Sequence, residues 1–580
     1  MLLLDPKHHD REYPDERSRE VMRAVIDFFE RKGKQALKDD DRANVWYADF
    51  LEFVKRERIF ATMCTPEAYG AADSRWDTWR NSEFGEILGF YGLAYWYTWQ
   101  VSVLGLGPIW MSRNDAAKAR AAALLEDGAI FAFGLSEKTH GADVYSTDMI
   151  LTAQGDGTWR ANGEKYYIGN ANAARMVSVF GKLTDTDEYV FFVADSQHPS
   201  FEVVKNVVNS QSFVANFALH DYPVTPGDIL HRGDDAWNAA LNTVNIGKYN
   251  LGWASIGICT HALYEAITHA SGRVLYGMHV TDFPHVRQMF VDAYARLVAM
   301  KLVALRAADY MRSASLEDRR YLLYNPVVKM KVTTQGEDVI NLLWDVVAAR
   351  GFEKDSYFEM AARDIRALPK LEGTVHVNIA LIVKFMPNYF FGHAEYPQVE
   401  RRSDAADDTF LFEQGPAKGL GAIRFHDPEE IFAAFDLPNV VVFREQMAAF
   451  RLLLMTSPPS EEQRRDIDFL MAAGQIFVTI VYAQLVLENA RIYGKEAGKE
   501  AGEEAGVEAG VDAPLVDHIF DVLVRDLSGH ALALYSKPSS TAEQMAGCLE
   551  MIRKPAVDAD RYQRVWKEVH ALAGRYQMNP

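Results

Sequence analysis

Hydrophobic positions follow three successive patterns along the chain. In residues 18–128 apolar residues recur at three- and four-residue spacing, as in SREVMRAVIDFFERKGKQAL, which predicts helices. In residues 131–230 the period changes to two, as in MVSVFGKL and YVFFVADS, and DG and NG pairs mark turns between the alternating runs. The helical period returns in residues 237–391. The pattern therefore predicts a β domain between two helical regions.

A polar segment rich in Gly and Pro follows, and the remainder of the chain is again helical. A repeat of Gly and Glu at every fourth position, in GKEAGKEAGEEAGVEAGVDAP, interrupts this last region and predicts a solvated, frayed helix or loop. We expect an α+β fold, mainly α, with these parts: N-terminal helical domain 1–130; middle antiparallel β domain 131–232; helical bundle 233–395; linker 396–427; additional C-terminal helical domain 428–580.

The most apolar segment is FLMAAGQIFVTIVYAQLVL. Gln475, Thr479 and Gln484 interrupt it, so it lacks the roughly 20 mainly apolar residues of a membrane span. We interpret it as a core or interface helix and expect no integral membrane span. The first residues also lack the basic region and apolar length of a signal peptide.

Charge and cysteine content narrow the function classes. The formal net charge of -19 argues against a nucleic-acid-binding protein, because phosphate binding needs clustered positive charge. The three cysteines, Cys64, Cys259 and Cys548, are too far apart in sequence to indicate a zinc site or a disulfide framework. We therefore expect no metal, a reducing compartment and a cytoplasmic location.

Two segments carry candidate chemistry. In FAFGLSEKTHGADVYSTD, at the entrance to the β domain, Ser136, Thr139, Gly141 and Asp143 form a cluster that can offer backbone N–H groups and a hydroxyl to a flat heteroaromatic ligand. The same cluster can be an ordinary turn. In LEGTVHVN, Glu372 precedes a predicted helix, where it is either part of a helix cap or a catalytic base.

Five segments together, in this order and spacing, resemble the acyl-CoA dehydrogenase family over roughly residues 15–395. They are FGLSEKTHGADV, NGEKYYIGNANAA, ALYEAITHASGRVLYGMHV, VVAARGFEKDSYFEMAARD and LEGTVHVN. The resemblance implies a helix–β–helix fold that holds FAD noncovalently.

Carried over position by position, the resemblance implies three sets of site residues. The cofactor set is Phe133, Leu135, Ser136, Gly141, Ala142, Tyr167, Ile168, Gly169, Arg273, Asp345, Ala349, Gly373, Thr374 and His376. The substrate set is Ala142, Lys248, Trp96, Trp99, Leu371 and Gly373. The catalytic set is Glu372 alone, and Arg273 is expected to reach the FAD pyrophosphate of a neighbouring subunit.

Several positions depart from the family pattern. Ser136 replaces a flavin-bonding Thr, Tyr167 replaces a Trp, and Gly169 replaces a Thr whose hydroxyl usually bonds the flavin. Further replacements, which bear on the FAD contacts and the substrate site, are Ala142 for Ser, Lys248 for Arg, Pro284 and Asp345 for Gln, and Ala348-Ala349 for a Gly pair.

The family's reaction requires a base like Glu372. The α-proton of a thioester is only weakly acidic, so donors must polarise the carbonyl, and a carboxylate whose pKa rises as water is excluded must take the proton. Some relatives carry their base just before the position of Lys248, but Gly247 stands there in this chain. Glu372 is therefore interpreted as the base.

Two clues to the acyl group conflict. Trp96, Tyr97 and Trp99 fall on the helix expected to floor the acyl pocket, and their bulk favours short, branched or ring-bearing acyl groups unless they are ordinary core aromatics. The C-terminal extension instead resembles the very-long-chain branch of the family, whose members are usually dimers.

The resemblance thus predicts FAD-dependent dehydrogenation of an acyl-CoA or acyl-carrier thioester by a homodimer. Electrons are expected to pass to an electron-transfer flavoprotein, as in β-oxidation. Two alternatives stay open: a flavin oxidase on the same fold that uses oxygen, and a non-catalytic relative that binds a partner protein.

Overall fold

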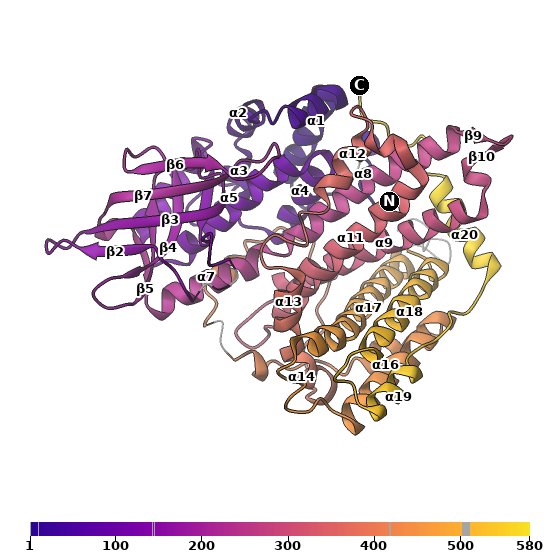
Figure 1. Cartoon of the computed structure of the whole chain (residues 1–580). Helices are drawn as coiled ribbons and strands as arrows, with labels where there is room; N and C mark the ends of the chain where they lie inside the picture. The colour runs from indigo at the N-terminus through magenta and orange to yellow at the C-terminus, as the bar shows by residue number, and fades with distance from the viewer. Residues whose placement is uncertain (1, 10, 142, 144, 417–418, 501–510) are drawn as a thin grey trace. The chain divides into compact units, whose positions relative to one another are not determined.

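A computed structural model describes residues 2–9, 11–141, 143, 145–416, 419–500 and 511–580, with the backbone alone for residues 495–500 (Figure 1). The chain divides into two compact units. Unit 1 comprises residues 1–10, 251–402 and 419–577, and unit 2 comprises residues 11–250, 403–418 and 578–580. Each unit is described by itself.

The elements of unit 2 follow the predicted helix-then-strand order. They are α1 (Glu16–Arg42), α2 (Ala48–Arg56), α3 (Ile59–Cys64), α4 (Thr78–Tyr91), α5 (Leu93–Met111), α6 (Asp115–Glu126), β1 (Phe131–Gly134), β2 (Ile150–Ala153), β3 (Trp159–Gly169), β4 (Met176–Leu183), β5 (Tyr189–Ala194), β6 (Phe201–Asn206), β7 (Val214–Val224), η2 (Pro226–Asp228), β8 (Ile229–Arg232), α7 (Asp234–Gly247) and η7 (Thr409–Phe412).

Unit 1 is helical apart from one short hairpin. Its elements are η1 (Pro6–His8), α8 (Asn250–Gly272), β9 (Val274–Leu275), β10 (Met278–His279), η3 (Val280–Asp282), α9 (Pro284–Arg312), α10 (Tyr321–Val327), η4 (Val328–Val332), α11 (Thr333–Val347), η5 (Ala348–Phe352), α12 (Tyr357–Asp364), α13 (Val375–Ile382), η6 (Val383–Phe385), α14 (Met386–Phe391), η8 (Leu420–Ala422), α15 (Glu429–Ala433), α16 (Pro438–Thr456), α17 (Ile467–Glu500), α18 (Ala513–Tyr535), α19 (Ala542–Glu550) and α20 (Ala559–His570). The α+β class, mainly helical, is confirmed.

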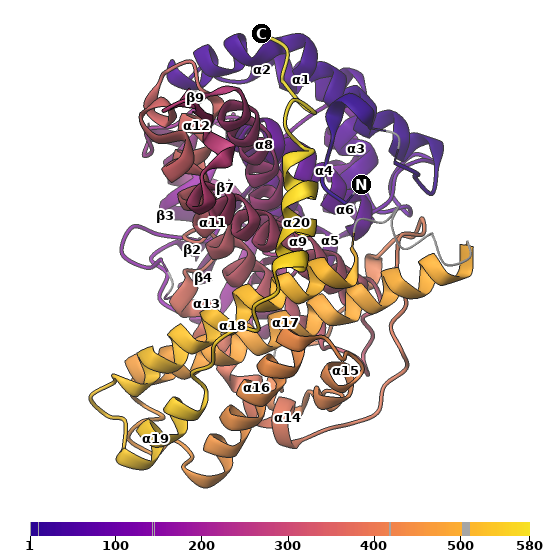
Figure 2. The same cartoon turned by 90° about the vertical axis from the view of Figure 1, so that its right-hand side faces the viewer.

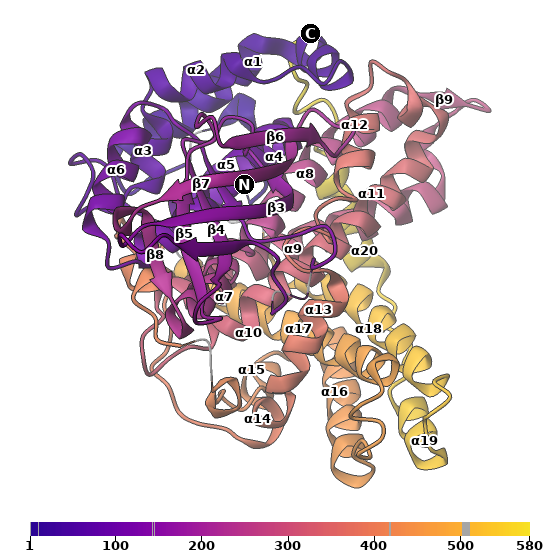
Figure 3. The same ribbon diagram turned by 60° about the vertical axis from the view of Figure 1, so that its left-hand side comes forward.

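The sheet of unit 2 has the strand order β6-β7-β3-β2-β4-β5-β8, with β1 paired to β4. Figure 3 shows β6, β7, β3, β4, β5 and β8 of this sheet. We predicted an antiparallel sheet, and most pairs are antiparallel. However, β1 and β2 each run parallel to β4, so the sheet is mixed. Parallel neighbours need a long connection between them, and the β2–β3 hairpin lies within the connection from β1 to β4. The inward side chains of the sheet, including Val177, Phe192 and Phe217, are fully buried.

The long helix α1 contains a break that the end of the chain fills. Asp15 caps the start of the helix by accepting a hydrogen bond from Ser18 N at 2.8 Å. Gly33 then departs from helical geometry with a φ of 77°. Beside this break, Lys34 N donates to Asn579 O at 2.7 Å, and Asn579 Nδ2 donates to Glu30 O at 2.7 Å. The tail therefore satisfies backbone groups that the break leaves without helical partners.

Helix α17 is a core helix of unit 1. It is long and apolar enough to cross a membrane, but 83% of its apolar window is buried inside the structure. It runs beside α18 (Figures 1 and 2). Glu488 of α17 accepts from Arg306 Nε and from Tyr310 Oη, each at 2.8 Å, in the bundle interior. A buried carboxylate with a cationic partner belongs in a protein core, as the interrupted apolar pattern predicted.

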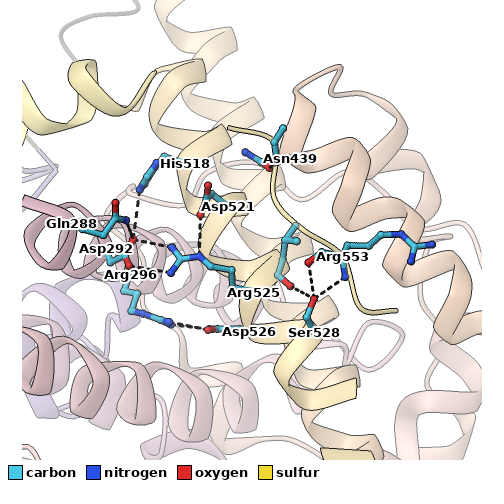
Figure 4. A network of polar contacts seen from close by, with 12 residues as sticks. Gln288, Asp292, Arg296, Asn439, His518, Asp521, Arg525, Asp526, Ser528 and Arg553 are labelled. Atoms are coloured by element: carbon cyan, nitrogen blue, oxygen red, sulfur yellow. Dashed lines mark hydrogen bonds and ion pairs between the residues drawn. The ribbon is translucent and has the colours of Figure 1, made fainter. Parts of the chain in front are cut away.

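A second polar network joins α18 to α9 (Figure 4). Arg525 of α18 donates to Asp292 of α9 at 2.8 Å, and Arg296 of α9 donates to Asp526 of α18 at 2.7 Å. The C-terminal region, predicted as an additional domain, thus packs with residues 251–402 in one compact unit. The domain boundaries at 395 and 428 remain predictions.

Part of the predicted linker is bound to unit 2. Asp407 accepts hydrogen bonds from Glu67 N at 3.0 Å and Trp76 N at 2.8 Å, and Asp408 accepts one from Thr78 N at 2.7 Å. Asp407 and Asp408 therefore fasten this part of the predicted linker to the start of α4 and the residues before it, within unit 2.

Candidate active site

The predicted residues fall in both units. In unit 2, Phe133 lies on β1, and Leu135 and Ser136 follow it, all three half-buried. Tyr166 N donates to Ser136 O at 2.9 Å, and Lys165 Nζ donates to Leu135 O at 3.1 Å. These bonds fasten the segment after β1 to Lys165 and Tyr166 of β3, so Ser136 lies against the residue that precedes Tyr167.

Tyr167 combines an unusual backbone conformation with a largely exposed side chain. Its φ is 64°, and the pairing of β3 with β7 shifts register between Lys165 and Ile168. Such a bulge re-aims a side chain, and a non-glycine residue with positive φ stores strain. The ring of Tyr167 is 60% exposed, whereas Ile168 is buried. The bulge therefore presents an aromatic face at the surface of unit 2.

The structure explains why position 169 is a glycine. A Cβ atom on Gly169 would lie 2.6 Å from Tyr97 Cε1 and 2.8 Å from both Tyr97 Oη and Val101 Cγ2. Real Cβ atoms do not approach carbon this closely, so the Thr of the family pattern is excluded unless Tyr97 moves. The phenol of Tyr97 occupies the space that a side chain at position 169 would need.

Glu137 and Lys165 form a buried ion pair behind Ser136. Lys165 Nζ lies 2.6 Å from Glu137 Oε1, and both side chains are almost fully buried. Burial disfavours the charged form of each group, and it lowers the pKa of Lys165 to about 8 although Glu137 opposes the shift. For Glu137 the Lys165 ammonium and the hydrogen bonds outweigh burial and lower the pKa. Both residues lie within the motif segments but are not among the predicted site residues.

Asn170 is a second residue that the motifs contained without assigning a role. Its amide donates to Thr98 O at 2.8 Å and to Phe131 O at 3.0 Å, while Thr98 Oγ1 donates to Asn170 Oδ1 at 3.0 Å. The side chain is fully buried and the φ is 62°. Asn170 thus fastens the end of β3 to both α5 and β1.

The loop after Ser136 is only partly described. Gly141 is exposed, with open space where a Cβ would stand. Ala142, predicted to contact cofactor and substrate, lies outside the described residues. Glu137, His140 and Asp148 hold potential metal-ligand atoms within 4.8 Å of one another, but Glu137 is already paired with Lys165. We assign no metal to this group.

Three predicted substrate residues, Trp96, Trp99 and Lys248, lie in the interior of unit 2. Trp96 and Trp99 of α5 are fully buried, and Trp99 packs edge-on against Phe84 with ring centroids 5.4 Å apart. Lys248 follows α7 and is 5% exposed. Gln100 of α5 accepts from Asn250 at 2.9 Å and donates to Gly247 O at 3.1 Å, so it holds the chain on both sides of Lys248.

In unit 1, Glu372 sits in a strained turn before α13. Its φ is 50°, and the φ of Gly373 is 85°, so two successive residues are left-handed. Glycine adopts this conformation freely, whereas glutamate does not. Thr374 caps α13 by accepting from Val377 N at 3.4 Å, so the hydroxyl, two residues beyond Glu372, forms the cap. Leu371 and Glu372 are half-buried.

Two residues absent from the predicted set hold this turn. Lys329 Nζ donates to Pro369 O at 2.8 Å and also to Gly373 O. Asn378 Nδ2 donates to Gly373 O at 3.1 Å and to Thr374 O at 3.0 Å. The only signal for Lys329 in the sequence is a lysine within the apolar run NPVVKMKV.

The other predicted residues of unit 1 are exposed on separate elements. Arg273 begins the β9–β10 hairpin, Asp345 lies on α11, Ala349 lies in η5 and His376 lies on the first turn of α13. Ala348 has a φ of 56°, which explains why a glycine suits the position that Ala348 occupies here. The roles of these residues stay predictions.

Comparisons with known proteins find similarity to acyl-CoA dehydrogenases. Residues 234–386, which include the Glu372 turn, match the family model of the acyl-CoA dehydrogenase C-terminal domain. A short-chain-specific acyl-CoA dehydrogenase of Megasphaera elsdenii is 22% identical over 371 residues, covering 62% of this chain and 95% of that one.

Solved structures show the same fold. An acyl-CoA dehydrogenase complexed with FAD, from Bacillus anthracis, is 16% identical with a TM-score of 0.75, covering 98% of this chain and 96% of that one. The likeness therefore includes the C-terminal extension. A nitroalkane oxidase is 15% identical with a TM-score of 0.58, covering 65% of this chain and 96% of that one. The chain therefore contains a region that matches the acyl-CoA dehydrogenase C-terminal family model, and it has the fold of these solved structures.

Proposed function

We propose that this protein catalyses the FAD-dependent α,β-dehydrogenation of an acyl-CoA thioester to the trans-2-enoyl thioester. The strained turn at Glu372 carries the proposal. It lies within the matched family domain, and the structure holds its carboxylate-bearing residue in a conformation that glutamate adopts only at a cost.

The residues of unit 2 fit a flat heteroaromatic cofactor. The bulge in β3 exposes the Tyr167 ring, and Ser136 lies beside it with its carbonyl fixed by Tyr166 N. An exposed aromatic face next to backbone polar groups and a hydroxyl is the environment that an isoalloxazine ring requires. Phe133, Leu135, Ser136 and Tyr167 would hold the ring, and FAD would supply the hydride acceptor for the β-hydrogen of the substrate.

Glu372 would remove the α-proton. Its half-buried carboxylate becomes fully shielded once an acyl chain excludes water, which raises the basicity that the reaction needs. The backbone N–H of Glu372 would donate to the thioester carbonyl and stabilise the developing enolate oxygen. Gly373, which has no side chain, would leave room for close approach of the thioester.

The remaining assignments rest on the resemblance to the acyl-CoA dehydrogenases. Coenzyme A is the carrier we propose, with an acyl-carrier protein as the other candidate. We propose an electron-transfer flavoprotein as acceptor, a homodimer as the assembly, β-oxidation as the pathway and a cytoplasmic location. Arg273, exposed on its hairpin, would contact the cofactor of the second subunit.

A flavin oxidase is the second candidate. The likeness to a nitroalkane oxidase supports it, because that enzyme shares the fold. Stoichiometric hydrogen peroxide during turnover in air would favour the oxidase. A protein that cannot take up FAD would instead favour the non-catalytic, partner-binding alternative.

An anaerobic titration with acyl-CoAs from four to sixteen carbons tests the proposal through the visible absorption of the flavin. We expect at least one acyl-CoA to bleach the wild type, and Glu372→Gln to bind the same compound with bleaching slowed at least about 1,000-fold, since the base is gone. Unimpaired bleaching of Glu372→Gln would contradict the assignment of the base. A yellow protein that no acyl-CoA bleaches would contradict the dehydrogenase.

A further inference from the structure

Two buried lysines stand two positions apart in a single irregular turn of unit 1. Lys329 is fully buried and Lys331 is 4% exposed, and both belong to η4, which has π-helical geometry. One π turn inside a helix shifts the direction of its side chains and is frequent at functional sites. Burying two ammonium groups is costly unless both find partners, so their surroundings need an explanation.

The two lysines have different partners. Lys329 donates to Pro369 O at 2.8 Å and to Gly373 O, the carbonyls on either side of the Lys370–Glu372 segment. Lys331 instead lies 3.9 Å from Asp526 of α18, which is already paired with Arg296 (Figure 4). One lysine therefore holds the Glu372 turn, and the other belongs to the network that joins α9 and α18.

The connection through Lys329 differs in kind from that through Asn378. Asn378 lies on α13, five residues beyond Gly373, so its bonds to Gly373 O and Thr374 O are local. Lys329 reaches the turn from η4, a different element separated by 44 residues from Gly373. Without Lys329, the carbonyls of Pro369 and Gly373 would lose the donor that ties the turn to the rest of the bundle.

We infer that Lys329 is a positioning residue for the proposed reaction: it clamps the Pro369 and Gly373 carbonyls and thereby fixes Glu372 in its left-handed conformation. The inference rests on the proposed function only in taking Glu372 as the base. A misplacement of about 1 Å in a reacting group can lower a rate about 100-fold, so loss of the clamp would act mainly on kcat.

Comparing Lys329→Met with the matched control Lys331→Met tests this role. Each variant removes one buried ammonium group from η4, but only Lys329→Met removes the donor to the Glu372 turn. Hydrogen–deuterium exchange of the purified protein measures the clamp without substrate. We expect amides 371–375 to exchange at least about 10-fold faster in Lys329→Met and within about 2-fold of wild type in Lys331→Met. Equal exchange at these amides in the two variants would overturn the clamp.

Steady-state kinetics and their pH profile measure the consequence. With the best acyl-CoA, Lys329→Met should lose about 100-fold in kcat with KM within about threefold, and its pH–kcat profile should shift, because the base is no longer held in one environment. Lys331→Met should keep kcat within about threefold, and Lys329→Arg, which still donates, should recover part of the loss. A wild-type kcat in Lys329→Met, or equal losses in both Met variants, would overturn the inference.

Failure of the proposed function gives a different result. If no acyl-CoA is turned over by the wild type, or if Glu372→Gln is as active as the wild type, the dehydrogenase or its base is wrong. The exchange comparison still decides whether Lys329 holds the turn.

Discussion

Each unit holds one candidate segment with a strained residue near a buried lysine, and the two lysines have different partners. In unit 2, Tyr167 has a φ of 64° on β3, and Lys165 lies two residues before it; in unit 1, Glu372 has a φ of 50°. Lys165 bonds a carboxylate, Glu137, at 2.6 Å and the carbonyl of Leu135 at 3.1 Å. Lys329 bonds the carbonyls of Pro369 and Gly373. A strained residue near a buried lysine is thus present in each unit.

The difference in partners predicts a difference in consequence. Breaking the Glu137–Lys165 ion pair of unit 2 should lower stability strongly, because removing one partner leaves an unpaired buried charge. The carbonyls bonded by Lys329 are neutral, so losing their donor costs less stability and acts on position instead. Loss of the Lys165 contacts should therefore lower the free energy of unfolding, whereas loss of the Lys329 contacts should lower kcat.

The largest expected effect on stability is that of Lys165→Met. The substitution leaves the Glu137 carboxylate buried with only its neutral donors, Thr147 Oγ1 at 2.6 Å, Asp148 N at 2.8 Å and Met149 N at 3.3 Å. We expect the free energy of unfolding to fall by about 3 kcal/mol in urea denaturation. Flavin content per protein should fall as well, because Leu135 O loses its donor.

The double variant Lys165→Met/Glu137→Gln is the matched control. It removes the unpaired charge and should recover at least about 1 kcal/mol of the loss. A double variant less stable than Lys165→Met would show that the charge on Glu137 is not the source of the cost.

The fold was largely predictable because its signals are periodic. The change of period from helical to alternating located the strands of unit 2, and the interruptions at Gln475 and Gln484 identified α17 as a core helix. The pairing of β1 with β4 was not predictable, since parallel neighbours far apart in sequence leave no local signal. For the same reason Arg306 could not be matched to Glu488, which lies 182 residues away.

The candidate site was predictable as motifs but not as contacts. Ser136 and Tyr167 could be named as cofactor residues because each lies in a local motif, and that role stays a prediction. The Tyr97 phenol that fills the space beside Gly169 depends on the packing of α5 against β3. The contact of Lys329 was not predictable, because its partners are backbone carbonyls. Every residue has a backbone carbonyl, so no residue type indicates the contact.

The pH dependence of the free energy of unfolding tests the Lys165 contact through a smaller effect. The folded pKa of Lys165 is about 8 because of its burial, against an ordinary value of 10.5. Between these values the unfolded chain binds a proton that the folded protein has released, so the free energy of unfolding rises with pH. We expect wild type to gain about 1 kcal/mol relative to Lys165→Met from pH 8 to pH 9. A constant difference in this window would mean that Lys165 keeps its proton.

The smallest effect tests whether the strain at Glu372 serves function. Glycine adopts the left-handed conformation without a Cβ penalty, although it also loses more chain entropy on folding. Glu372→Gly should therefore raise the free energy of unfolding by about 0.5 kcal/mol while abolishing acyl-CoA turnover. Thermal unfolding and the anaerobic bleaching assay measure the two quantities.

Asp187 provides the matched control outside the candidate site. It lies in the turn between β4 and β5 with a φ of 56°, and its ion pair with Lys182 at 3.2 Å is on the surface. Asp187→Gly should give a comparable gain in stability, since an exposed ion pair contributes little, and should leave turnover unchanged. If Glu372→Gly were destabilised while Asp187→Gly was stabilised, the carboxylate of Glu372 would hold its own turn together. The strain would then be a by-product of packing, and the Glu372 turn would no longer parallel the Tyr167 bulge.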